Sequence, residues 1–147
     1  MLSAEDLLSK EERTRVEQAI AQAERSTSAE IRIHLEDHIE EDVLDHAAYV
    51  FEELGMHRTA DRNGILIYIC VADRAMAVIG DKGIDERVPP GFWDDVIVSL
   101  RNNFIQQRFA EGLMEAVDTV GRLAGEFFPR ARNDRNELSN EVSFTRK

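Results

Sequence analysis

The sequence has one cysteine and three prolines, and it lacks any long uncharged stretch. With Cys70 alone, the chain can form no internal disulfide and cannot build a zinc site from several thiolates. No segment runs uncharged for the roughly 20 residues that a membrane helix needs, and the N-terminus lacks the basic start and apolar run of a signal peptide. The sequence therefore predicts a cytoplasmic protein that does not insert into a membrane.

Positive charge is also scarce. The chain carries 29 acidic and 18 basic side chains, for a net charge of −11. The acidic excess lies in the body of the chain up to Pro129, whereas the tail that follows is mixed and slightly basic. Such a body repels nucleic acid and anionic lipid and favours cations or basic partners. We therefore expect a divalent cation as the first partner and another protein as the second, with no nucleic acid.

The signatures of common catalytic sites are missing. The stretch "GDKG" lacks the longer glycine spacing and the Ser or Thr of a phosphate-binding loop. No Gly-x-Ser-x-Gly elbow occurs, and Cys70 lies within an apolar run, where a thiol is normally inert packing. The sequence alone leaves open whether the chain is an enzyme.

Hydrophobic spacing predicts alternating helices and strands in one domain, residues 1–129, followed by a polar, loosely ordered tail, residues 130–147. Helices are expected over about 10–25, 41–54, 90–104 and 109–127, and strands over 31–35, 64–71 and 76–79. Alternation in the first strand predicts one face exposed to water, whereas the continuous apolar run of the second predicts burial on both faces. In the second helix the residues expected to face inward are Leu44, Ala47, Ala48, Phe51 and Leu54.

The order of these elements predicts how the strands pair. The first strand, the helix and the second strand form a βαβ unit, which normally makes the two strands parallel. The third strand returns antiparallel in a hairpin, so its end meets the starts of the other two at one sheet edge. Six acidic and amide side chains are expected to converge there: Glu30, Asp61, Asn63, Asp81, Asp85 and Asp94.

Carboxylate and amide oxygens are ligands for a hard cation, and the carbonyls of Gly80 and Gly83 lie nearby in the sequence. Without a cation, neighbouring carboxylates would raise one another's pKa. The six side chains therefore predict a Ca²⁺ site, with Mg²⁺ as the alternative. The competing interpretation is that the acids solvate a turn and favour a helix N-terminus, and for Glu86 and Asp95 we prefer it.

The opposite end of the sheet offers a weaker candidate. Ligands of open α/β sheets usually bind beyond the carboxyl ends of the strands. The stretch "HLEDH" places three candidate ligands there, and the hairpin turn adds an acid: His34, Asp37, His38 and Asp73. Two histidines and a carboxylate can bind zinc. The alternative is that these are exposed loop residues.

Several stretches, taken in order, resemble the TPM domain family. They are "STSAEI" at the entry to the first strand, "NGILIYI" in the second, "ADRAMAVIGDKGI" through the hairpin, and "FIQQRFAEGL" before the last helix. The resemblance covers nearly the whole chain up to Pro129. The tail "NDRNELSNEVS" is similar to that of a soluble bacterial branch without a signal peptide or membrane anchor.

The resemblance implies a three-layer α/β/α sandwich with a small mixed sheet and about four helices. It also implies divalent-metal binding, often of calcium, at an acidic pocket, and acid phosphatase activity as in thylakoid relatives. Glu30, Asn63 and Asp81 match family motif positions. Asp73 with Arg74 matches the family's Asp-Arg motif, for which the alternative interpretation is a pair that only stabilises a turn. The first functional hypothesis is a calcium-binding interaction module, and the alternatives are a metal-dependent acid phosphatase and an interaction module without metal.

Overall fold

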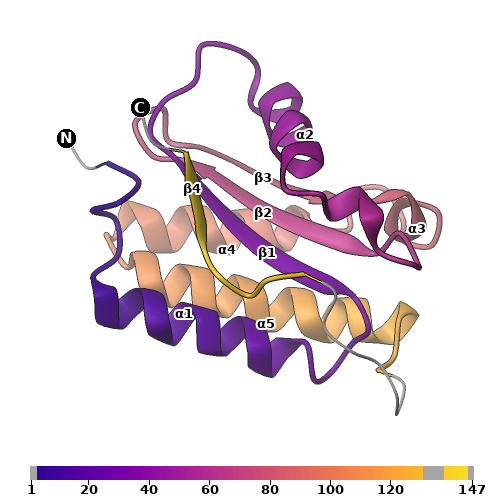
Figure 1. Ribbon diagram of the computed structural model, residues 1–147. Helices are drawn as coiled ribbons and strands as arrows, with labels where there is room; N and C mark the ends of the chain where they lie inside the picture. The colour runs from indigo at the N-terminus through magenta and orange to yellow at the C-terminus, as the bar shows by residue number, and fades with distance from the viewer. Residues whose placement is uncertain (1–2, 131–137, 146–147) are drawn as a thin grey trace.

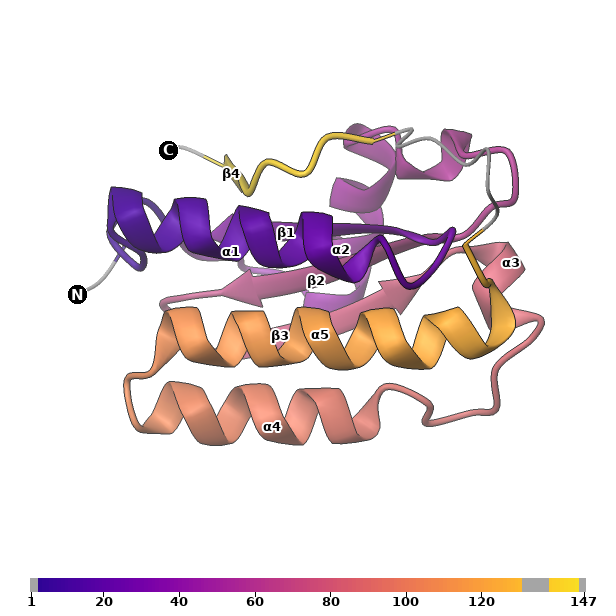
Figure 2. The ribbon, with the colours of Figure 1, turned by 90° about the horizontal axis from the view of Figure 1, so that it is seen from below.

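The computed structural model describes residues 3–130 and 138–145. A mixed sheet lies between two layers of helices (Figure 1). Three helices, α1 (Lys10–Ala23), α4 (Asp94–Ile105) and α5 (Phe109–Phe127), cover one face, and α2 (Val43–Glu53) covers the other. Helix α5 packs between α1 and α4 (Figure 2). The predicted α/β/α sandwich is confirmed.

The sheet has the strand order β3-β2-β1-β4. Its strands are β1 (Glu30–Glu36), β2 (Gly64–Cys70), β3 (Ala75–Gly80) and β4 (Ser143–Thr145). Strand β1 runs parallel to β2 and to β4, and β3 pairs antiparallel with β2. The predicted βαβ unit and hairpin are therefore confirmed, whereas β4 was not predicted.

Strand β2 is buried along its whole length. Ile65, Ile67 and Ile69 belong to the core beneath α1, α4 and α5, and Leu66 and Tyr68 belong to the core beneath α2. This is the double-faced burial that its continuous apolar run predicts.

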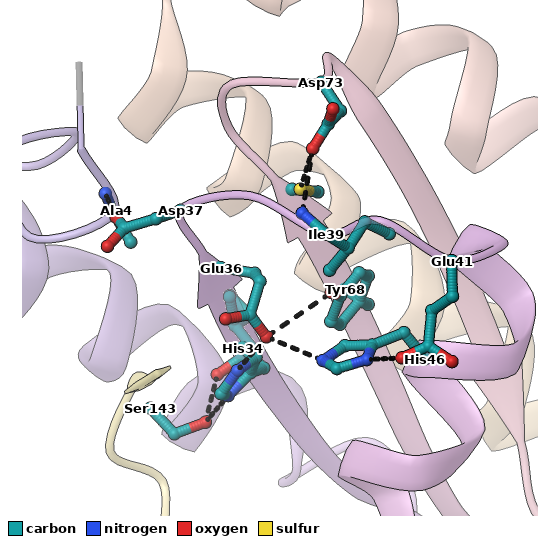
Figure 3. A network of polar contacts seen from close by, with 12 residues as sticks. Ala4, His34, Glu36, Asp37, Ile39, Glu41, His46, Tyr68, Asp73 and Ser143 are labelled. Atoms are coloured by element: carbon teal, nitrogen blue, oxygen red, sulfur yellow. Dashed lines mark hydrogen bonds and ion pairs between the residues drawn. The ribbon is translucent and has the colours of Figure 1, made fainter. Parts of the chain in front are cut away.

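The prediction of a wet face on β1 is wrong. His34 is only 3% exposed and Glu36 is fully buried. Both side chains lie beneath α2, where His46 of that helix contacts Glu36 (Figure 3). The polar face of β1 is therefore buried, because α2 and the tail cover it.

The inward face of α2 also differs from the prediction. Ala47 and Phe51 are buried as expected, but Leu44 is 58% exposed and Ala48 is exposed. Asp42 caps the helix by accepting the backbone N–H of Leu44 and of Asp45, and so fixes where it starts. The first turn then lies beside the edge strand β3, so Leu44 borders a groove instead of the core.

Helix α4 begins at Asp94, later than the predicted start at about Pro90. Gly91 has a φ of +74°, a left-handed conformation that interrupts a right-handed helix. A one-turn helix α3 (Lys82–Asp85) and a 3₁₀ turn η1 (Met56–Arg58) complete the described elements.

The tail is not loosely ordered throughout. Ser143–Thr145 forms β4, whose Phe144 pairs with Leu35 of β1. Glu17 of α1 accepts the backbone N–H of Val142 at 2.9 Å, and Arg13 lies over the Phe144 ring. Residues 131–137, also part of the predicted tail, lie outside the described residues.

Val142→Ala should lower the free energy of unfolding by about 2 kcal/mol, because Val142 is only 6% exposed and its loss leaves a gap in the core. Urea unfolding of the full chain measures this. Glu141→Gln, at an exposed neighbouring position, should stay within about 0.5 kcal/mol of the parent. Equal effects of the two substitutions would contradict the packed position of the tail.

A candidate cation site in an acidic hollow

The register of the sheet places two predicted site residues in one row. Glu30 pairs with Gly64, and the backbone N–H of Asp81 donates to the Gly64 carbonyl at 2.9 Å. Two strand spacings separate Glu30 from Asp81, which is ~10 Å. A Cβ on Gly64 would lie 2.9 Å from the Met56 carbonyl oxygen and 3.4 Å from the Phe51 ring. The space between the two carboxylates is therefore filled by Met56 and Phe51.

Asp81 lies in a hollow of about 790 Å³ between α2 and α3. Acidic side chains from both helices line it: Asp45, Glu52, Asp81, Asp85 and Glu86. Three side chains that can carry positive charge also line it: His57, Arg62 and Lys82. Arg87 does not line the hollow and instead donates to the Phe127 carbonyl. The hollow thus combines oxygen ligands with cationic groups.

Asp81 is held by contacts to both of its oxygens. Arg62 donates from Nε at 2.7 Å and from Nη2 at 2.8 Å, and the backbone N–H of Lys82 donates at 2.8 Å. Asp81 is 7% exposed, whereas the Arg62 side chain is 47% exposed. The buried carboxylate is therefore paired with a cation that reaches it from solvent.

Gly83 allows the chain to approach closely beneath this pair. Its N–H donates to the Arg62 carbonyl at 2.8 Å. A Cβ at this position would lie 2.3 Å from the Asp61 carbonyl oxygen, which is impossible without backbone movement. Glycine at this position therefore holds α3 against the segment that supplies Arg62.

Asp85 differs from Asp81 in having no ion pair with any described residue. Partial burial, and secondly the neighbouring Asp81 carboxylate, raise the pKa of Asp85 above its ordinary value. The ionised form of Asp85 is thus disfavoured, as expected for a partly buried carboxylate that has no counter-ion among the described residues.

Glu30 and Asn63 form a separate group away from the hollow. The Asn63 amide donates to the Ser28 carbonyl at 3.1 Å, and its buried Oδ1 has no hydrogen-bond partner among the described residues. Glu30 contacts Glu24, whose carboxylate accepts the Ile31 N–H at 2.8 Å. Burial and the charge of Glu30 raise the pKa of Glu24 to about 8.

The remaining two predicted residues are not gathered with either group. Asp61 is exposed, and only its backbone meets α3. Asp94 lines a neighbouring groove together with Asp85. Within 3–130 and 138–145, no three His, Cys, Asp or Glu side chains form a group that could hold a metal ion as they stand. The structure therefore brings Asp81 and Asp85 together but not all six residues.

The side chains of the weaker candidate, the zinc site, do not converge either. His38 contacts Asp73 at 2.9 Å, Asp37 accepts the Ala4 N–H at 2.6 Å, and His34 points into a different cluster (Figure 3). Asp73 also accepts the Ile39 N–H, so it fixes the loop after β1. The interpretation as loop residues fits Asp37, His38 and Asp73.

Sequence reasoning missed a buried polar network beneath α2. Glu36 lies 3.1 Å from Nε2 of His46 and 3.5 Å from Nε2 of His34, and the Tyr68 hydroxyl donates to it at 3.5 Å. Ser143 of β4 lies 2.8 Å from Nδ1 of His34 (Figure 3). Burial lowers the pKa of His34, the largest effect, against the opposing Glu36 charge. The signal available in the sequence was that His34 and Glu36 are alternate residues of one strand and therefore lie on the same face.

Comparison with known proteins assigns the fold and then the family. The structure is similar to the NMR structure of the BA42 protein from the psychrophilic bacterium Bizionia argentinensis, with 39% identity over 99% of this chain and 100% of that one and a TM-score of 0.91. The N-terminal domain of a P. gingivalis protein shares the fold, with 20% identity over 86% and 83% of the two chains and a TM-score of 0.67. No curated protein matched.

The model of the TPM domain family matches residues 2–123. The chain therefore belongs to the TPM domain family, as the resemblance of its motifs indicates. None of the described helices has the length and apolar character needed to span a bilayer.

Glu24→Gln should become more stable relative to the parent as pH rises. Native Glu24 keeps its proton up to about pH 8, whereas the unfolded chain releases it near 4.5, so the parent loses stability between these values. The difference should reach on the order of a few kcal/mol. Urea unfolding across this pH range measures it, with the exposed Glu11→Gln as control. Parallel pH curves for parent and Glu24→Gln would refute a protonated Glu24.

Proposed function

We propose that this TPM domain binds a divalent cation in the acidic hollow, with calcium favoured over magnesium. The observation that supports the proposal is the pair of carboxylates, Asp81 and Asp85, that share the hollow, of which only Asp81 has a cationic partner among the described residues. A cation beside Asp85 would favour its ionised form, which burial and, secondly, the charge of Asp81 disfavour. The predicted cytoplasmic location is part of this proposal.

The donor set fits a hard cation. Carboxylate oxygens are the preferred ligands of Ca²⁺ and Mg²⁺, and the backbone of Gly80 also lines the hollow. Two carboxylates leave most positions to water and backbone carbonyls. Calcium tolerates such an irregular set better than magnesium, which demands near-octahedral geometry.

Arg62 is the internal competitor of the ion. It occupies both oxygens of Asp81, but its side chain is 47% exposed and can swing into solvent. Bound cation and bound Arg62 would then be alternative ways to neutralise Asp81. In the bound form the ion neutralises the acidic edge and orders the segment 80–90 for a partner protein.

Calorimetric titration of chelator-treated protein should show saturable calcium binding and weaker magnesium binding. Asp81→Asn with Asp85→Asn should abolish it, because the two carboxylates that we propose as ligands lose their charge. Glu30→Gln with Asp94→Asn, which removes equal charge at predicted positions outside the hollow, should retain it. In the parent, saturating calcium should raise the free energy of unfolding by about 2.7 kcal/mol at 100 times Kd.

The two double variants also locate the site. Binding lost in the Glu30/Asp94 pair but kept in the Asp81/Asp85 pair would move the site away from the hollow. Absence of binding to either ion in the parent protein would overturn the proposal.

A second candidate function is a metal-dependent acid phosphatase acting on phosphate monoesters. It is favoured by the cationic groups of the hollow, Arg62, Lys82 and His57, which can hold phosphate oxygens beside the carboxylates. The name of the matching family model also contains the word phosphatase. A bound cation would supply charge neutralisation for the phosphate and an activated water.

The phosphatase alternative predicts slow hydrolysis of p-nitrophenyl phosphate that requires calcium or magnesium. Lys82→Ala should raise KM, because Lys82 would contribute binding charge, and Asp85→Asn should abolish turnover. Turnover that is unchanged in Asp85→Asn would identify a contaminating enzyme. Calcium binding without turnover would leave the cation-binding function standing alone.

A further inference from the structure

The two edges of the sheet differ in whether another strand covers them. The β1 edge is covered by β4, whereas β3 ends the sheet on the other side (Figure 1). Edge strands are normally protected by charges, proline or bulges. The sequence of β3, "AMAVIG", contains no charge and no proline, and its pairing with β2 is continuous. The described structure thus leaves one apolar edge strand without such protection.

The register shows which backbone groups point outward. Asp81 donates its N–H to Gly64, so the pairs bonded to β2 continue through Ile79 and Ala77. The N–H and C=O groups of Met76, Val78 and Gly80 therefore point away from β2. Among the described residues, no backbone or side-chain group is hydrogen-bonded to them.

A groove of about 590 Å³ runs along this edge. Met76 and Val78 form its floor, Leu44 of α2 stands on one side, and Trp93 with Ile97 stands on the other. Leu44 is 58% exposed, so the wall it forms is open to a ligand. The groove offers free strand hydrogen bonds between apolar walls, which is the arrangement used by proteins that bind extended peptides.

Two acids border the same groove, Asp85 and Asp94. Neither is ion-paired with a described residue. They favour a ligand with a basic side chain and disfavour an acidic one. A second copy of this chain fits poorly, because each copy carries a net charge of −11 and would bring the same acids to the interface.

We propose that the β3 edge binds an extended peptide segment of a partner protein, which adds to the sheet as a further strand. The segment has apolar side chains at alternate positions, for the walls at Leu44 and Trp93, and a Lys or Arg that meets Asp85 and Asp94. This surface goes beyond the proposed cation site and does not depend on a bound ion.

The test is selection of a random-peptide phage library on the full chain, in chelator so that no ion contributes. Enriched peptides should alternate apolar residues and carry Lys or Arg. A synthetic enriched peptide should lose about tenfold or more in affinity when one inward-facing amide is N-methylated, because its side chains remain but a strand hydrogen bond is lost. Hydrogen exchange at Met76 and Val78 should slow on binding, and exchange at Ala77 and Ile79 should not change.

Protein variants localise the peptide. Leu44→Ser should weaken binding several-fold, whereas Val98→Ser, at a 52% exposed aliphatic position on α4 outside the groove, should not. Val78→Pro removes one outward N–H without removing a bond to β2 and should abolish binding. The N-methylated peptide needs no change in the protein, so it decides the question if Val78→Pro fails to fold.

Three results would overturn the proposal. They are no enrichment of alternating basic peptides, equal binding by Leu44→Ser and Val98→Ser, or affinity unaffected by N-methylation. Sedimentation of the parent as a dimer that Val78→Pro converts to a monomer would assign the edge to a second copy instead. Loss of calcium binding in Asp81→Asn, which leaves Asp85 and Asp94 unchanged, with peptide affinity retained would separate this surface from the cation site.

Discussion

The burial of β2 on both faces is the constraint on which the rest of this structure depends. All seven of its residues are buried, so the strand is stable only if one helical layer covers each side. The α1, α4 and α5 layer and the single helix α2 meet that requirement. Because β1 is parallel to β2 and β3 is antiparallel, the starts of two strands and the end of the third lie at one edge. The position of the acidic hollow follows from that topology.

This edge is the amino end of the parallel strands, where ligands of open α/β sheets are less common. The location of the acidic hollow at the amino end has a local cause. Strand β3 returns to that end, and Gly83 lets the following turn rest on the backbone of Asp61 and Arg62. The same approach places the Arg62 side chain against Asp81, whereas the neighbouring Asp85 has no counter-ion among the described residues. The electrostatics of the hollow therefore depend on a backbone contact that no other residue at position 83 permits.

Local patterns predicted β1, β2, β3 and the four long helices, since each depends on spacing within one segment. They also placed Glu30 and Asp81 at one edge of the sheet, because the directions of the strands decide which ends meet there. They did not show that Met56 and Phe51 fill the space over Gly64, or that α2 and β4 bury His34 and Glu36. Those features come from contacts between segments far apart in the sequence, such as Ser143 with His34, and no periodicity encodes them. Strand β4 was missed for the same reason, being too short to show a period.

Asp85 lines both the acidic hollow and the β3 groove, so the two proposed ligands are not independent. A cation beside Asp85 cancels charge that a basic peptide side chain would otherwise meet, and linkage makes the effect reciprocal. Apart from Asp85, the two surfaces share only the Gly80 end of β3, because the outward backbone groups of Met76 and Val78 and the walls at Leu44 and Trp93 lie outside the hollow. An ion would therefore weaken the attraction for a basic side chain while leaving strand pairing at Met76 and Val78 intact. The acids between Asp81 and Asp94 are best understood as serving two adjoining surfaces, since the fold separates Asp81 from Asp94 and shares Asp85 between them.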